Sequence, residues 1–134
     1  MAGENVLPVE HYPDDFRVIN YFVHDASAAD ELFFYCDRNM VVDSVTVSVA
    51  AAGAASSTVV IKAIAPGTAP TAANVAAGTA VSNALALDAT GVVSGTIVNT
   101  ANVLPAGTHL GFDYTGTVSG FRGMFTVRIR SRLK

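Results

Sequence analysis

The stretch VVDSVTVSVA, residues 41–50, decides the fold expected of this chain. Between Val45 and Val49 every second residue is a valine, and a threonine and a serine stand between them. Because successive side chains of a β-strand point to opposite faces, this two-residue period predicts a half-buried strand. Its odd-numbered positions are expected to face the core.

Seven further segments around this stretch have the composition of strands. They are rich in β-branched and aromatic residues and are bounded by turn-forming residues. With the first stretch they make about eight expected strands: 16–24, 32–36, 41–50, 58–65, 80–87, 95–99, 109–114 and 123–130. Residues 66–80 are expected to form a long loop, because Pro66, Gly67 and Pro70 do not fit a central strand. Residues 25–30 are expected to hold at most one helical turn.

Short strands separated by irregularly spaced turns are typical of antiparallel β-sandwiches. We therefore predict an all-β chain with a single antiparallel β-sandwich, a jelly roll or another Greek-key variant, over residues 16–134. Residues 1–15 are expected to precede this domain as an extended N-terminal arm. Pro8, Pro13 and four carboxylates make this segment unsuited to a sheet interior or a helix.

Length and composition support one domain that associates with other copies. The 134 residues have room for one core, and a hydrophobic fraction of 51% is too high for a disordered chain. Much of this fraction is alanine and valine, whose small side chains make a thin core. The single cysteine, Cys36, excludes an internal disulfide and is expected to be a small buried hydrophobe. We therefore expect a homo-oligomer, because a thin core in a small domain needs support.

Charged residues are concentrated at the two ends of the chain. From Ser44 to Phe112 only Lys62 and Asp88 are charged. Residues 1–43 carry nine acidic and two basic side chains (net −7), and residues 113–134 carry one acidic and five basic (net +4). This segregation indicates a neutral body that meets its partners through its ends. The overall charge of −3 gives no general attraction to nucleic acid.

The last expected strand carries a stripe of arginines. If Phe125, Val127 and Ile129 face inward, the alternate positions line up outward about 7 Å apart. Two interpretations stay open: the charges protect an edge strand from pairing, or they contact acidic groups of a neighbouring copy or another protein. Phosphate binding is disfavoured, because no aromatic residues interleave with the arginines. The candidate interface residues are Arg122, Arg128, Arg130 and Arg132 in this strand, and Glu4, Glu10, His11, Tyr12, Asp14 and Asp15 in the arm.

No motif for catalysis, metal binding or nucleotide binding stands out. His11, His24 and His109 lack the spacing of metal ligands, and neither a nucleophile elbow nor a phosphate-binding loop is present. We therefore expect no catalytic residue, cofactor, metal or small-molecule substrate, and not an enzyme. No apolar run reaches the length of a membrane helix, and the first residues lack the features of a signal peptide. Synthesis in a cytoplasm, without membrane association, is expected.

Four aromatic residues near the C-terminal end allow two interpretations. Phe112, Tyr114, Phe121 and Phe125 suit a core, whereas exposed aromatic residues would suit a sugar-binding platform. The absence of tryptophan favours the core.

Three stretches carry a resemblance to a known class of proteins. They are residues 33–35 with 40–45, residues 65–70, and LPAGTHLGFDYTGT, residues 104–117. Together, residues 30–131 resemble small head proteins of tailed bacteriophages, of the decoration or cement type. The resemblance implies a jelly-roll or β-sandwich homotrimer without catalytic residues, bound to the major capsid protein on the outer surface of the virion. It also implies that the arm clamps neighbouring capsid subunits or protomers.

The resemblance leads to one expected function and two alternatives. We expect a structural virion protein, made in the host cytoplasm, that stabilises a phage head by bridging capsid subunits through many weak contacts. The alternatives are a phage fibre or receptor-binding module and a carbohydrate-binding β-sandwich.

Overall fold

The computed structural model describes residues 16–24 and 30–132. The predictions for the N-terminal arm, and for a helical turn starting at residue 25, lie outside the described residues. The same holds for six of the candidate interface residues: Glu4, Glu10, His11, Tyr12, Asp14 and Asp15.

The described residues are mainly β-strands. The strands are β1 (Phe16–His24), β2 (Glu31–Tyr35), β3 (Met40–Ala51), β4 (Thr58–Ile64), β5 (Thr79–Ala80), β6 (Leu85–Ala86), β7 (Gly91–Ser94), β8 (Val103–Leu104), β9 (His109–Thr115) and β10 (Arg122–Ser131). One short helix, α2 (Ala72–Ala76), lies between β4 and β5.

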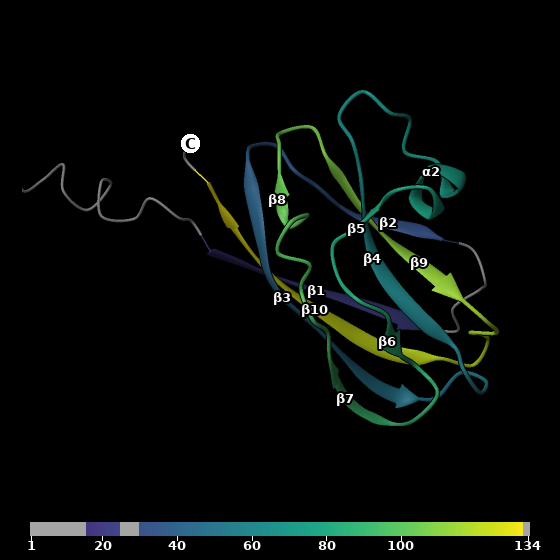
Figure 1. The fold of residues 1–134 in the computed structure, drawn as a ribbon. Helices are drawn as coiled ribbons and strands as arrows, with labels where there is room; N and C mark the ends of the chain where they lie inside the picture. Colours follow the sequence, from purple (N-terminus) through teal and green to yellow (C-terminus); the bar gives the residue numbers. More distant parts are fainter. Residues whose placement is uncertain (1–15, 25–29, 133–134) are drawn as a thin grey trace, which may run out of the picture.

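Two antiparallel sheets pack face to face (Figure 1). The first, here the β10 sheet, has the order β1-β10-β3-β7, and β8 also pairs with β3. The second, the β9 sheet, has the order β2-β9-β4-β5, and β6 also pairs with β4. The pairs are nested along the chain: β1 with β10, β2 with β9, β3 with β7 and β8, and β4 with β5 and β6. This nesting is the topology of a jelly roll, and the predicted all-β sandwich is confirmed.

The long loop expected over residues 66–80 contains a short helix instead. The side chain of Thr71 caps α2 by accepting a hydrogen bond from the backbone N–H of Asn74 at 3.2 Å. The alanines that follow favour helix, and this local preference outweighs the loop signal of the preceding prolines.

The strands expected at 80–87 and 95–99 were placed wrongly. The first is split into β5 and β6. In place of the second, β7 begins at Gly91 and ends before Gly95, whose added Cβ would lie 2.7 Å from Cγ1 of Val45. The chain passes close to the core there, and Ile97 makes only an isolated bridge with Ser82.

The valines of β3 face the core as the sequence predicts. Val45, Val47 and Val49 are 1%, 0% and 4% exposed. The alternation does not extend to Asp43, which is exposed, because the β3–β10 register shifts at this point and leaves Asp43 without a residue opposite it in the backbone pairing with β10. Such a bulge reverses the facing of the residues beyond it.

Aromatic rings join the two sheets at the centre of the core. The ring of Phe112 on β9 stacks on Phe33 at a centroid distance of 4.3 Å and on Phe125 of β10 at 4.2 Å. Phe112, Phe121 and Phe125 are fully buried and Tyr114 is 8% exposed. The core interpretation of this aromatic set is confirmed, and the sugar-platform interpretation is wrong. Cys36 is also fully buried, and burial raises the pKa of its thiol to about 12.

Candidate protein-contact surface

The arginine stripe lies on an internal strand, not on a sheet edge. β10 pairs with β1 along one side and with β3 along the other. Protection of an edge strand is therefore the wrong interpretation of these arginines, because the backbone groups of β10 are already paired. Strand order depends on pairing between distant segments, so the position of β10 at the chain end did not reveal its place in the sheet.

The predicted alternation along β10 is confirmed. Phe125, Val127 and Ile129 are at most 1% exposed and face the core. The residues between them face the opposite side of the β10 sheet, where three of the arginines are exposed and one is half-buried. The exposed ones are Arg122, Arg128 and Arg132, and the half-buried one is Arg130.

Two of these arginines have structural contacts. The Nε of Arg130 donates to both carboxylate oxygens of Asp43 at 3.0 Å, an arrangement made possible by the bulge in β3. The guanidinium of Arg128 lies over the ring of Phe16 at 5.6 Å from its centroid, within the range of a cation–π contact. The stripe thus combines positive charge with a neighbouring aromatic surface.

Large apolar side chains surround the arginines on the same side of the sheet. On β1, Phe16, Val18 and Phe22 are 58%, 55% and 75% exposed, and on β7, Val92 is 71% exposed. Phe22 pairs in register with Met124, Met124 with Ser48, and Ser48 with Val92, so a row of three apolar side chains and one serine crosses the sheet. We call this surface the contact face, defined by Phe16, Val18, Phe22, Val92, Arg122, Met124, Arg128 and Arg132.

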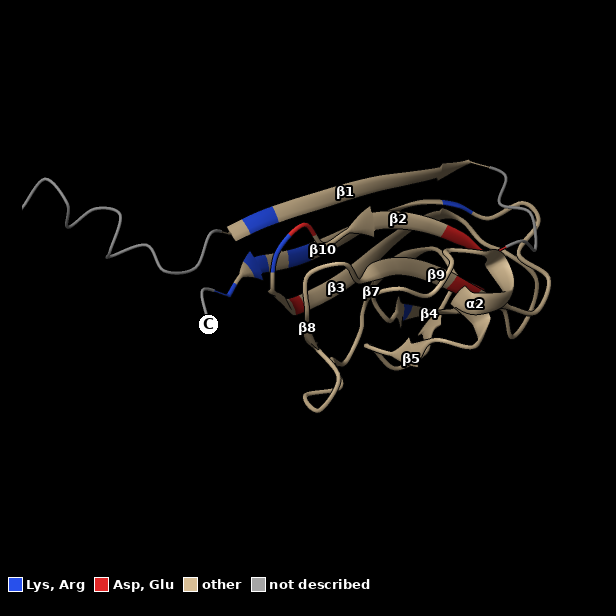
Figure 2. Cartoon of the chain, turned by 90° about the horizontal axis from the view of Figure 1, so that it is seen from above, with Lys and Arg blue, Asp and Glu red and all other residues tan. Residues whose placement is uncertain are grey.

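A shallow hollow opens at one end of the contact face. It measures about 350 Å³ and is lined by Phe22, Ser48, Ala50, Arg122 and Met124 among others. The opposite end is basic, because Arg128 and Arg130 of β10 lie there. These two arginines are in register with Val18 and Phe16 of β1. Figure 2 shows the basic segments of β10 beside the start of β1, at the end of the sheet that leads to the C terminus.

Sequence reasoning found the arginines of this surface and missed its apolar part. The missed signal lies in β1, FRVINYFVH, which is apolar on both sides: Ile19 and Val23 face the core, and Val18 and Phe22 face outward. A strand that is apolar on both faces is typical of strands covered on both sides. β1 is also a nine-residue edge strand, of the kind that proteins usually cover. The contact face therefore has the properties of a docking surface.

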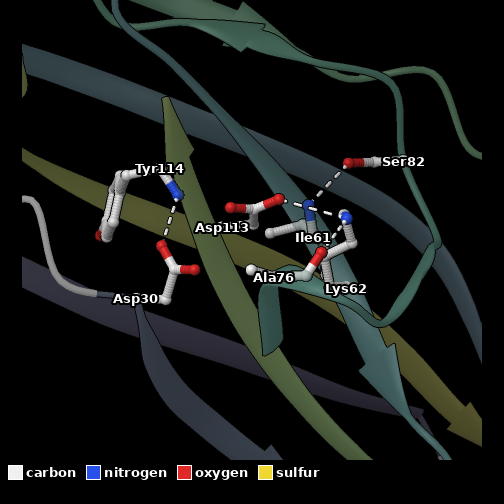
Figure 3. A network of polar contacts seen from close by, with 7 residues as sticks. All are labelled: Asp30, Ile61, Lys62, Ala76, Ser82, Asp113 and Tyr114. Atoms are coloured by element: carbon white, nitrogen blue, oxygen red, sulfur yellow. Dashed lines mark hydrogen bonds and ion pairs between the residues drawn. The ribbon is translucent and has the colours of Figure 1, made fainter. Parts of the chain in front are cut away.

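A polar network on the β9 sheet accounts for Lys62, one of the two charges in the neutral span (Figure 3). Its Nζ lies 3.2 Å from Asp113 and donates to the backbone oxygen of Ala76 at 2.9 Å, which attaches α2 to the sheet. Asp30 accepts a hydrogen bond from the backbone N–H of Tyr114 at 3.0 Å. These contacts hold β2, β4, β9 and α2 together, a structural role.

The other charge in the neutral span, Asp88, stabilises a turn. Its carboxylate accepts a hydrogen bond from the backbone N–H of Ser56 at 3.1 Å. Ser56 has a positive φ of 65°, a conformation that costs a non-glycine residue free energy and so needs support.

Replacing Asp30 tests the electrostatics of the polar network. Burial, and then the charge of Asp113, raise the pKa of Asp30 above its ordinary value of 3.8. The folded chain thus binds this proton more tightly than the unfolded chain, so the stabilising contribution is greatest at low pH and is lost as pH rises through the raised pKa. Asp30→Asn retains an acceptor for Tyr114 and cannot ionise. We expect its urea midpoint at pH 7 to equal or exceed that of the wild type, with a flatter pH profile above pH 4.

Asp37→Asn is the matched control, because Asp37 lies in a turn with its side chain 53% exposed. Asp37→Asn should leave the free energy of unfolding at pH 7 within about 0.5 kcal/mol of the wild type, as expected of an exposed substitution. A pH profile of Asp30→Asn that runs parallel to that of the wild type would show that Asp30 does not titrate as proposed.

Comparisons with known proteins leave the resemblance to phage decoration proteins as a prediction from the sequence. No protein family, curated protein or solved structure matches this chain. Within the described residues, no group of three or more His, Cys, Asp or Glu side chains is placed to hold a metal ion. In the same residues no helix has the length and apolar character needed to cross a membrane.

Proposed function

We propose that this protein is a structural virion protein that decorates the outer surface of a tailed-phage head as a homotrimer and binds the major capsid protein. The observation that carries the proposal is the contact face, where Phe16, Val18 and Phe22 are more than half exposed beside three exposed arginines. Such a surface on a jelly roll suits contact with other proteins in a lattice. The choice of a phage capsid as this lattice rests on the sequence motifs in residues 33–45 and 104–117.

The mechanism follows from mass action. A protein that binds the assembled head, and not its dissociated subunits, stabilises the head by RT ln(1 + [L]/Kd), about 2.7 kcal/mol at a concentration of 100 Kd. When several copies are linked, their weak contacts together give tight binding, and no single site needs to be strong. Phe22 is the best-placed anchor, because aromatic residues beside a hollow dominate interface energies.

Mixing the purified protein with undecorated phage heads tests this function. We expect saturable co-sedimentation and a higher melting temperature of the decorated heads. Phe22→Ser should weaken binding at least tenfold, whereas Tyr35→Ser should bind as the wild type does. Tyr35 is a matched control, because it is 53% exposed and lies on β2 in the opposite sheet.

Two outcomes would overturn the proposal. The first is no co-sedimentation and no change in head melting. The second is binding that depends on a saccharide, which would assign the chain to the fibre or carbohydrate-binding class instead.

A further inference from the structure

We infer that the basic end of the contact face, around Phe16, Val18, Arg128 and Arg132, binds the acidic N-terminal segment, residues 1–15, of a second copy of this chain. The opposite end, with Phe22 and the hollow, stays open to the phage head. The inference goes beyond the proposed function, because this association needs no phage head. It identifies one occupant for a surface that carries both exposed apolar groups and positive charge.

The charges of the N-terminal segment and of the contact face are complementary. Residues 1–15 contain four carboxylates, those of Glu4, Glu10, Asp14 and Asp15, and no lysine or arginine. At the basic end of the contact face, Arg128 and Arg132 form no ion pair within the described parts of the chain. An acidic segment supplies the countercharge that these guanidinium groups lack.

The apolar residues of the segment match the rest of the face. Val6, Leu7, Val9 and Tyr12 alternate with or flank the carboxylates. The basic end of the face offers the exposed ring of Phe16 and the exposed side chain of Val18. A segment with mixed apolar and acidic character is therefore complementary to a face with mixed apolar and basic character.

The length of the segment allows it to reach another copy. Fifteen extended residues span about 50 Å, whereas the nine residues of β1 span about 31 Å. The segment joins the body at Phe16, which is itself at the basic end of the face. β1 runs from Phe16 across its own sheet, so a segment that continues the line of β1 backward from Phe16 leads off the end of that sheet. The face within its reach there is that of a neighbouring copy.

Binding of the segment to the face of a second copy determines the symmetry of the assembly. A segment of one copy that binds the face of the next copy makes a head-to-tail interface, which closes into a ring when the rotation per copy permits. A ring of three agrees with the homotrimer of the proposed function. It also covers the start of the edge strand β1 in every copy.

Charge reversal in the full-length chain tests the inference without phage heads. The face variant is Arg128→Glu with Arg132→Glu, the segment variant is Glu10→Lys with Asp14→Lys, and the combined variant carries all four changes. Sedimentation equilibrium over a range of concentrations gives the mass and the midpoint of assembly. Thermal unfolding checks that each variant folds.

Arg122→Glu is compared with Arg128→Glu as a matched control. Both make the same charge change on the same face of β10, six residues or about 20 Å apart. Arg122 lies away from the basic end, so its reversal should shift the assembly midpoint less than threefold. Arg128→Glu should shift it about tenfold, and the shift should shrink at high salt.

The expected result is a wild-type oligomer of three chains, with face and segment variants that each need at least tenfold higher concentration to assemble. The combined variant should recover most of the loss. The inference is overturned if the wild type is a monomer at all concentrations, if the face variant assembles like the wild type, or if the combined variant assembles no better than the face variant. A failed head-binding assay would leave this result intact, so the two proposals fail separately.

Discussion

Phe112→Ala is expected to lower the free energy of unfolding by about 4 kcal/mol, the largest loss from any single side-chain truncation in this core. Phe112 is fully buried and contacts four other rings: Tyr21, Phe33, Tyr114 and Phe125. Two of these rings belong to the opposite sheet. These neighbours are rigid rings held on paired strands, so they cannot collapse into the cavity that the substitution leaves.

Thermal and urea unfolding measure this loss, which corresponds to a fall in Tm of about 12 °C for a chain of this size. Phe22→Ala is the matched control, because Phe22 is 75% exposed and its truncation should leave stability within about 0.5 kcal/mol of the wild type. A Tm for Phe112→Ala within two or three degrees of the wild type would mean that the sheets do not pack through this ring.

Gly123→Ala is expected to destabilise the fold by about 3 kcal/mol through overpacking. A Cβ at Gly123 would lie 2.5 Å from the backbone oxygen of Ser48 on β3 and 3.0 Å from the ring of Phe121. The backbone of β3 cannot yield easily, because β10 and β7 pair with it on either side. The strand must therefore shift as a whole.

Gly67→Ala is the matched control for Gly123→Ala. It measures the cost of adding a Cβ at a glycine with positive φ where the Cβ meets no other atom. Gly67 has a φ of +85° but has no atom within 4 Å of an added Cβ, so its substitution should cost about 1 kcal/mol. Urea midpoints of the two variants give the comparison. Equal losses, or a greater loss for Gly67→Ala, would contradict the close packing of β10 against β3.

The sequence predicts the fold class well because the deciding signals are local. The alternation from Val45 to Val49 depends only on neighbouring residues, and the same is true of the apolar character of β1 and β9. Strand order was not accessible in this way. β10, the last strand, lies between β1 and β3, which are distant from it in the sequence. No local signal in β10 marks it as an internal strand.

Only part of the contact face could be predicted from the sequence, because only part of it depends on residues that are neighbours along the chain. The outward arginines follow from alternation along one strand. The row of Phe22, Met124 and Val92 forms only when the four strands β1, β10, β3 and β7 come into register, so its members are far apart in the sequence. The pair between Arg130 and Asp43 depends on a bulge in β3, which the sequence does not mark.

Oxidative footprinting of the protein bound to undecorated heads tests the central claim, that the contact face is where this chain meets other proteins. Hydroxyl radicals modify exposed aromatic and sulfur-containing side chains, and mass spectrometry reports each site. We expect Phe22 and Met124 to be oxidised several-fold more slowly in the bound protein than in the dilute free protein, while oxidation of Tyr35 on the opposite sheet is unchanged. Unchanged oxidation of Phe22 and Met124, or protection of Tyr35 in their place, would contradict the central claim.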